Sequence, residues 1–239
     1  MDNNGNVVKP IHKKNIKQPN ITKTEVIHSG KWLSSNIIHY SDEDGVERQW
    51  ESVSRVTKVN SDVTDGVAII PVLKRRLHHD FFLLVKQFRP PIGGYSLEFP
   101  GGLIDKKDNG PCNAAIRELY EETGYCGKVT EVFENFNATL DPGVSETTIT
   151  FVCMEIDGDS KDNAIHQQHL DDGESIEIIL FPVRDFTLAK LTKWCNDSQD
   201  KISVDSRVVA YALGLQMGSN MNSKKMSMLM DDPPNETFK

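Results

Sequence analysis

The segment GLIDKKDNGPCNAAIRELYEETG, residues 102–124, decides the fold of this chain. It predicts a glycine-rich loop that leads into a helix carrying Glu118, Glu121 and Glu122. At about 100° per residue, these three carboxylates lie on one face of one helical turn. Gly124 follows them and predicts the C-terminal end of the helix.

Three carboxylates so close together repel one another unless a cation lies among them. Their oxygen atoms are hard ligands, and no cluster of His or Cys accompanies them in the sequence. This set favours Mg²⁺ or Mn²⁺ over zinc. Arg117 precedes Glu121 by four residues, so we expect it to hold Glu121 and to leave Glu118 and Glu122 for metal. The alternative is a solvated acidic helix face, the usual explanation for a run of charges.

The composition limits the class of protein. A length of 239 residues suits one domain with appendages, or a large domain and a small one. The net charge of −8 argues against a nucleic-acid partner, because no basic stripe is present to contact phosphates. An acidic chain can still bind a phosphate-bearing small molecule if bound cations recruit it.

The cysteines and the N-terminus indicate the compartment. The four cysteines are widely spaced and never form Cys-x-x-Cys, so we expect neither a zinc site nor a disulfide framework. The polar start contains no apolar signal-peptide core, and no apolar run approaches the length of a membrane span. These features predict a cytoplasmic or nuclear protein with reduced cysteines and no membrane partner.

The sequence pattern predicts four parts. Residues 1–22, rich in Asn and Lys, are expected to be disordered, and residues 23–60 to form an N-terminal β domain. Residues 61–218 should form the main domain, and the Met-rich residues 219–239 a disordered tail.

Secondary structure alternates in mixed order along the chain. Helical spacing is found in residues 183–196 and 205–215, and residues 157–173 are expected to be a long surface loop. Strands are predicted at 32–40, 47–56, 66–73, 80–89, 128–134, 147–156 and 175–181. The first two strands form a hairpin around the turn at Asp42–Gly45. This order predicts an α/β sandwich.

The opening segment resembles the Nudix box, which has a glycine, a glutamate and then Arg-Glu-hydrophobic-x-Glu-Glu-x-Gly-hydrophobic. Two departures are visible. The gap from Gly102 to Arg117 is one residue longer than usual, and Asp108 stands where the first glutamate is expected. Both departures precede the core at Arg117–Gly124, so we expect them to weaken the site little.

Motifs outside the box resemble the ADP-sugar (ADP-ribose) pyrophosphatase branch of the Nudix family, and together they span residues 28–215. They are Gly30-Lys31-Trp32, Trp50-Glu51-Ser52-Val53-x-Arg55, residues 85–91, Gly93-Gly94-Tyr95, residues 98–105, Asp141-Pro142-Gly143-x-Ser145 and Asp205-x-Arg207-Val208. The resemblance implies a Nudix-type α/β/α sandwich with a small N-terminal β-sheet domain. It also implies a homodimer in which the N-terminal sheet is swapped, so that two subunits build each site.

The resemblance also assigns roles to residues. It implies that metal is held by Gly101 through its carbonyl and by Glu118, Glu122 and Glu174, with Glu121 and Arg117 completing the catalytic set. On residue type alone Glu174 is a solvated loop charge, and Glu177 is the fallback for its role. The implied substrate contacts are Trp32 and Trp50 around the adenine, Glu51 at its edge, Arg55 and Arg89 on the diphosphate, Leu103, and Asp141 in a nearby loop. Without the resemblance, a tryptophan in a hairpin is more often structural.

The activity implied is Mg²⁺-dependent hydrolysis of the pyrophosphate of ADP-sugars, chiefly ADP-ribose to AMP and ribose 5-phosphate. Two or more Mg²⁺ ions per site are expected, with Mn²⁺ as an alternative. A hydrolase for oxidised nucleoside diphosphates would use the same catalytic residues. A non-catalytic ADP-ribose-binding module is the third hypothesis, and the intact Glu118, Glu121 and Glu122 argue against it.

Overall fold

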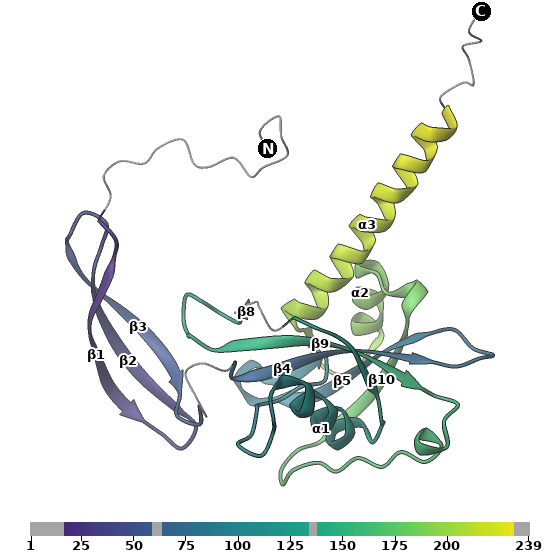
Figure 1. The fold of residues 1–239 in the computed structure, drawn as a ribbon, viewed down its shortest axis with the longest axis horizontal. Helices are drawn as coiled ribbons and strands as arrows, with labels where there is room; N and C mark the ends of the chain where they lie inside the picture. The colour runs from purple at the N-terminus through teal and green to yellow at the C-terminus, as the bar shows by residue number, and fades with distance from the viewer. Residues whose placement is uncertain (1–16, 59–63, 134–137, 232–239) are drawn as a thin grey trace, which may run out of the picture. The chain divides into compact units, whose positions relative to one another are not determined.

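The computed structural model describes residues 17–58, 64–133 and 138–231. The chain divides into two compact units (Figure 1). The first unit runs to Asp62 and includes Ala138–Thr148, and the second contains Val63–Asn137 and Ile149–Lys239. The division therefore falls near the predicted boundary at residue 60, except that residues 138–148 group with the N-terminal part.

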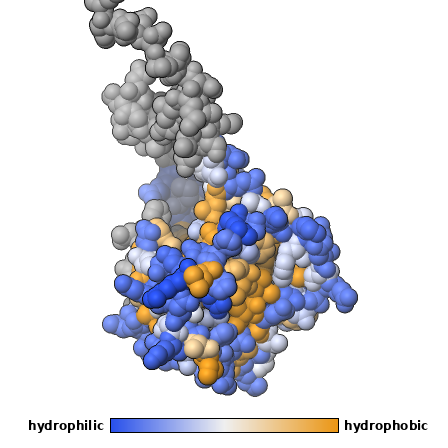
Figure 2. Space-filling model, turned by 90° about the vertical axis from the view of Figure 1, so that its right-hand side faces the viewer, coloured by the Kyte–Doolittle hydropathy of each residue, from blue (hydrophilic) through white to orange (hydrophobic). Residues whose placement is uncertain are grey.

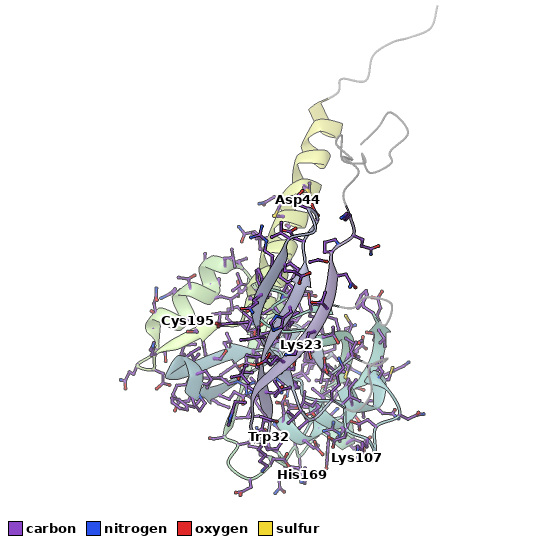
Figure 3. The ribbon with its side chains drawn as sticks, turned by 90° about the vertical axis from the view of Figure 1, so that its left-hand side faces the viewer. Lys23, Trp32, Asp44, Lys107, His169 and Cys195 are labelled. Atoms are coloured by element: carbon purple, nitrogen blue, oxygen red, sulfur yellow. The ribbon has the colours of Figure 1, made fainter. Side chains whose placement is uncertain are left out.

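The first unit is an antiparallel sheet of order β1-β2-β3. Its strands are β1 (Asn20–Ser29), β2 (Leu33–Ser41) and β3 (Glu47–Arg55), and the short β8 (Ala138–Thr139) belongs to the same unit. Strands β2 and β3 form the predicted hairpin, whose turn is fixed by Asp42 Oδ1 accepting from the amides of Asp44 and Val46. Trp32 and Asp44 lie at opposite ends of this sheet (Figure 3).

Strand β1 corrects the predicted N-terminal tail. Residues 20–22 were expected to be disordered, but Asn20 pairs with Ser41 and Ile21 with Tyr40 at the start of β1. Backbone pairing to β2 explains the difference, because a polar sequence can still complete a ladder. Residues 17–19 precede β1 without regular structure, and residues 1–16 of the predicted tail lie outside the described residues.

The second unit is built around a mixed sheet of order β11-β6-β5-β4-β9-β7, in which β10 also pairs with β5. Its strands are β4 (Gly66–Lys74), β5 (Phe81–Arg89), β6 (Gly94–Glu98), β7 (Lys128–Val132), β9 (Thr148–Asp157), β10 (Ile176–Pro182) and β11 (Ile202–Val204). Its helices are α1 (Pro111–Thr123), α2 (Leu188–Asp197) and α3 (Ser206–Asp231), with 3₁₀ turns at Pro90–Ile92, Lys161–Asn163 and Val183–Asp185.

Two hydrophobic layers cover the two faces of this sheet. Consecutive residues of a strand point to opposite faces, so Ile69 packs with Leu119 of α1, whereas Ile70 packs with Leu191 of α2 and Val208 of α3. Figure 1 shows α1 on one side of the sheet and α2 with α3 on the other. Full burial of one such side chain contributes about 1.5–3 kcal/mol. The predicted α/β/α sandwich is confirmed.

The surface of this unit is mainly polar, although not everywhere. Figure 2 shows hydrophilic residues over most of one view, with a band of hydrophobic side chains between them. Among the described residues, no helix has both the length and the apolar content that crossing a bilayer requires.

Several predicted boundaries differ from the structure. The helix expected from residue 183 starts at Leu188, because Val183–Asp185 forms a 3₁₀ turn and Thr187 caps the helix. The short strands β6 and β11 were not predicted. Helix α3 continues to Asp231, beyond the expected ends at residues 215 and 218, because no proline interrupts the sequence before Pro233.

Candidate active site

Helix α1 carries the glutamates, and its ends are set by local sequence. Pro111 occupies its first turn, and Gly124 ends it in the left-handed conformation with φ 71°. Ala115 and Leu119 bury one face against the sheet. The predicted helix is therefore confirmed, and its buried face fixes the direction in which Glu118 and its neighbours project.

Two glycines bring the backbone of residues 100–103 directly against these carboxylates. The amide of Gly101 donates to Glu122 Oε2 at 2.9 Å. A Cβ on Gly102 would lie 2.2 Å from Glu118 Oε1, so any other residue there would displace that carboxylate. The carbonyls of Pro100 and Gly102 accept from β4, whereas the Gly101 carbonyl has no hydrogen-bond partner among the described residues. That carbonyl is therefore available to a further partner, as the metal role requires.

Burial raises the pKa of both carboxyl groups, Glu118 and Glu122. Desolvation raises the pKa of Glu122 to about 8, assisted by the charges of Glu118, Glu174 and Glu98 and opposed by the Gly101 amide. Desolvation also raises the pKa of Glu118 to about 6, although Arg117 opposes it. Two buried carboxylates that resist ionisation in this way are stabilised as anions by a divalent cation.

The donor set fits a hard divalent cation. Glu118, Glu122 and the Gly101 carbonyl supply oxygen atoms, which suit Mg²⁺ or Mn²⁺. Within the described ranges, no three His, Cys, Asp or Glu side chains already form a metal-ligating group. The chemistry and burial of the residues therefore match the metal, while their oxygen atoms are not gathered into one coordination shell.

Arg117 organises the cluster more widely than expected. Its Nη1 donates to Glu118 Oε1 and to Glu121 Oε2, both at 2.8 Å. The expectation that Arg117 leaves Glu118 free is therefore wrong. The guanidinium is a planar fork with several donors, so one group can serve two carboxylates that face it. Its Nη2 also donates to the carbonyl of Leu103 at 2.9 Å.

Asp108 has a role that sequence reasoning missed. Its carboxylate accepts from Arg117 Nε at 3.1 Å and from Nη2 at 2.8 Å, and its side chain is only 5% exposed. The hydrogen bonds from Arg117 hold the pKa of Asp108 below its ordinary value. The position in the box where Asp108 replaces glutamate was the available signal, and the structure shows that the residue there anchors Arg117.

A second ion-pair network lies at the ends of β5 and β6. Arg89 Nε and Nη2 donate to the two carboxylate oxygens of Glu98 at 2.8 and 2.9 Å. Arg207 Nη2 lies 3.8 Å from the same carboxylate and is itself bound by Asp205. The Arg89 side chain remains 46% exposed, so the guanidinium keeps an accessible edge for an anion. Sequence reasoning singled out Arg89 but gave no role to Glu98.

Glu174 lies within electrostatic reach of the cluster. It follows Gly173, which has φ 85°, and its carboxylate accepts from the amide of Asp171 at 3.1 Å. Its charge contributes to the raised pKa values of Glu118 and Glu122. The fallback residue Glu177 instead pairs with Lys86 Nζ at 2.8 Å. The ion pair engages Glu177, whereas the charge of Glu174 acts on the cluster, so Glu174 stays the first candidate for the loop glutamate.

In the first unit, the two tryptophans lie at the surface. Trp32 is 57% exposed and has Lys31 Nζ 4.5 Å from its ring centroid, while Trp50 is 51% exposed. Neither side chain is buried in the core of this unit, and the choice between a stacking role and a structural role stays a prediction. Trp50 Nε1 donates to the Gly143 carbonyl at 2.9 Å. This bond fastens one edge of the indole and leaves the ring accessible.

The other predicted residues of this unit are found on the same sheet and loop. Glu51 is exposed on β3, and Arg55 at the end of β3 has a buried Nε with no hydrogen-bond partner among the described residues. Asp141 forms a turn in which its carbonyl accepts from Val144 and Ser145. The first unit thus brings the predicted loop against the strand that carries Trp50.

Comparison with known proteins matches residues 62–200 to the NUDIX domain. The chain is 41% identical over 204 residues to the ADP-sugar pyrophosphatase of Mus musculus, covering 85% of this chain and 89% of that protein. It is 36% identical over 197 residues to the ADP-ribose pyrophosphatase of Saccharomyces cerevisiae, covering 81% of each. A crystal structure of an ADP compounds hydrolase superposes with a TM-score of 0.50 at 16% identity, over 77% of this chain and 97% of that one, which bears on the fold alone.

Proposed function

The chain belongs to the Nudix family and is a hydrolase of that family, and we propose that it cleaves the pyrophosphate of ADP-sugars. The preferred substrate is ADP-ribose, with AMP and ribose 5-phosphate as products. The observation that carries the proposal is the pair of buried carboxylates of Glu118 and Glu122, set against Gly101 and Gly102.

The metal in this proposal is Mg²⁺, two or more ions per site, with Mn²⁺ as an alternative. Glu118, Glu122, Glu174 and the Gly101 carbonyl would hold it. When bound, the metal neutralises the diphosphate oxygens and lowers the pKa of a bound water. Arg117 fixes the directions of Glu118 and Glu121 through its hydrogen bonds.

The substrate would be bound by groups that suit each of its parts. Arg89 offers the free edge of its guanidinium to the diphosphate, and Arg55 offers its unpaired Nε. The exposed rings of Trp32 and Trp50 would stack on the adenine. Glu51, Leu103 and Asp141 remain the further contacts that the resemblance implies.

We also propose a homodimer in which the N-terminal sheet is exchanged between subunits. Hydrophobic side chains are exposed along the first unit, and no hydrophobic side chain among its described residues is buried. Contiguous exposed apolar side chains mark protein interfaces. The dimer would place Trp32 of one subunit and Trp50 of the other around one adenine. We propose a cytoplasmic or nuclear location, with neither nucleic acid nor membrane as partner.

One panel tests the activity directly. The purified chain is incubated with Mg²⁺ and ADP-ribose, ADP-glucose, NADH, diadenosine polyphosphates or 8-oxo-dGDP, and products are separated by chromatography. We expect the highest kcat/KM for ADP-ribose, with AMP as product. Preference for 8-oxo-dGDP would assign the sanitising activity instead, and ADP-ribose binding without product would identify a binding module.

A further inference from the structure

The segment that precedes Glu174 is fastened to the C-terminal end of α1. After β9 the chain passes beneath α1 in Figure 1 before it enters β10. His169 N–H donates to the Glu121 carbonyl at 2.8 Å, and the rings of His169 and Tyr120 are stacked with centroids 5.0 Å apart (His169 is labelled in Figure 3). The predicted surface loop, residues 157–173, is therefore docked on the C-terminal end of α1 at His169.

Glycine at the end of the helix permits this docking. A Cβ on Gly124 would lie 2.5 Å from the backbone nitrogen of Gln167, so any other residue at position 124 would collide with the segment. The last carbonyls of a helix have no partner within it. In this chain the docked segment supplies donors to the carbonyls of Glu121 and Glu122.

Gln168 holds both ends of the loop that carries Glu174. Its Nε2 donates to the carbonyl of Glu122 at 2.6 Å and to the carbonyl of Ile176 at 3.0 Å. Glu122 is a proposed metal ligand on α1, and Ile176 begins β10, two residues after Glu174. One primary amide therefore joins the helix to the strand that follows the loop, and both of its N–H groups are used.

We propose that Gln168 is a positioning residue for hydrolysis, which sets the reach of Glu174 toward Glu118 and Glu122. The loop between His169 and Ile176 contains Gly173 with positive φ, and its last five residues are exposed. The hydrogen bonds of residues 171–175 among the described residues join only Asp171 and Glu174, so they do not fasten the loop to the rest of the unit. The tie at Gln168 shortens the free part of the chain. This inference rests on the proposed function, because it assigns Gln168 an effect that passes through Glu174.

The test compares Gln168→Met with Gln167→Met. Methionine keeps the length of glutamine but donates no hydrogen bond, and the neighbouring Gln167 is exposed with no side-chain bond among the described residues. For Q168M we expect kcat to fall about 10–100-fold, the range for residues that orient metal ligands, with KM within about twofold. Q167M should keep both constants. An unchanged kcat in Q168M would overturn the proposal.

A double-mutant cycle with Glu174→Gln shows whether the effect passes through Glu174. In the E174Q background, Q168M should lower kcat no further. The same fold-loss in both backgrounds would mean that Gln168 acts by another route and would overturn the proposal. Full activity of E174Q alone would remove Glu174 from the mechanism, and this inference with it, while leaving the hydrolase assignment in place.

Amide hydrogen exchange gives a readout that does not depend on activity. In Q168M, amides of residues 169–175 should exchange faster, while those of β4 and β5 keep the wild-type rate. If Q168M is too unstable to study, Gln168→Glu keeps the shape of the side chain and also removes both donors, so the same loss is expected. Unchanged exchange in residues 169–175 would contradict the tie, even if no substrate were hydrolysed.

Discussion

The two units of this chain differ in where their hydrophobic side chains lie. The second unit buries residues such as Ile69 and Leu84 in layers on both faces of its sheet. In the first unit, no described hydrophobic side chain is buried, and Ile21 and Val26 are about as exposed as its tryptophans. A small sheet is stable on its own only with enough strands and a hydrophobic face, or with another element packed against it. The second unit carries its own core, and we propose that the first is stabilised by a second copy of the chain.

The same contrast applies to the polar groups. In the second unit the carboxylates of Asp108 and Glu122 are buried and held by defined donors. In the first unit, Trp50 has one hydrogen bond and an open ring face. The second unit thus holds its carboxylates in a defined arrangement, and we propose that the first presents recognition groups that a partner completes.

The largest expected effect concerns the prepared chemistry of the second unit. Glu122→Gln should lower kcat for ADP-ribose by about 10²–10⁴, because metal-ion stabilisation of several kcal/mol is lost at about 1.4 kcal/mol per tenfold. The fold should be retained, because an uncharged amide is easier to bury than this carboxylate. Steady-state kinetics at saturating Mg²⁺ and a melting curve measure both.

The control for this change is Glu131→Gln, the same substitution at an exposed residue of β7. It should leave kcat unchanged. Wild-type turnover by E122Q would remove Glu122 from the metal site.

The second prediction tests the proposed dependence of the first unit on a partner. Val26→Glu places a charge among exposed apolar side chains of β1 and should shift the protein toward monomer in sedimentation. ADP-ribose hydrolysis should fall in proportion to the dimer that is lost. Leu77→Glu, at a residue of the second unit that is 93% exposed, should leave both unchanged. A monomer with full activity would contradict the proposed shared site.

The third prediction compares a tryptophan from each unit. Trp50→Ala should raise KM for ADP-ribose about 5–100-fold with little change in kcat, because about 1–3 kcal/mol of stacking is lost equally in the ground and transition states. Trp194 of α2 packs against the hydrophobic layer that contains Leu191 and Val208, so Trp194→Ala should lower the melting temperature and leave KM unchanged. A lower melting temperature with normal KM for W50A would return Trp50 to a structural role.

The sequence predicted the elements whose pattern is local. The helix that ends at Thr123 could be placed because its glutamates share one face and Gly124 follows it. Strands β4 and β5 could be placed because their apolar runs fit strands covered on both faces. Strand β11 has only three residues, and its identity as a strand comes from pairing with β6. No periodicity exists in so short a segment.

In the candidate site, too, the sequence predicted the local pattern but not the contacts between distant residues. The glutamates of α1 follow from spacing, whereas the partners of Arg117 depend on how the preceding loop folds back. Asp108 lies nine residues before Arg117, and Glu98 meets Arg89 only because β5 and β6 are paired. These contacts are set by tertiary structure, and a single sequence contains no direct signal for them.

The smallest effect expected is the pH dependence of stability in the metal-free protein, and it separates the buried carboxylate from the surface charges of the first unit. Burial raises the pKa of Glu122 to about 8, above its ordinary value of 4.5. The folded state therefore binds this proton more tightly than the unfolded state, so stability is full below the unfolded pKa and falls as pH rises to about 8. The melting temperature in EDTA should decrease across this window by about 2–4 °C for each kcal/mol lost. In the first unit, hydrogen bonds from its partners lower the pKa of Asp42, so the contribution of Asp42 to stability is lost only in acid, outside this window.

Two controls identify the titrating group. E122Q should show a shallower decrease of the melting temperature, and added Mg²⁺ should remove most of the decrease in the wild type by stabilising the ionised carboxylate. Equal slopes for E122Q and wild type in EDTA would show that Glu122 is not the group that titrates.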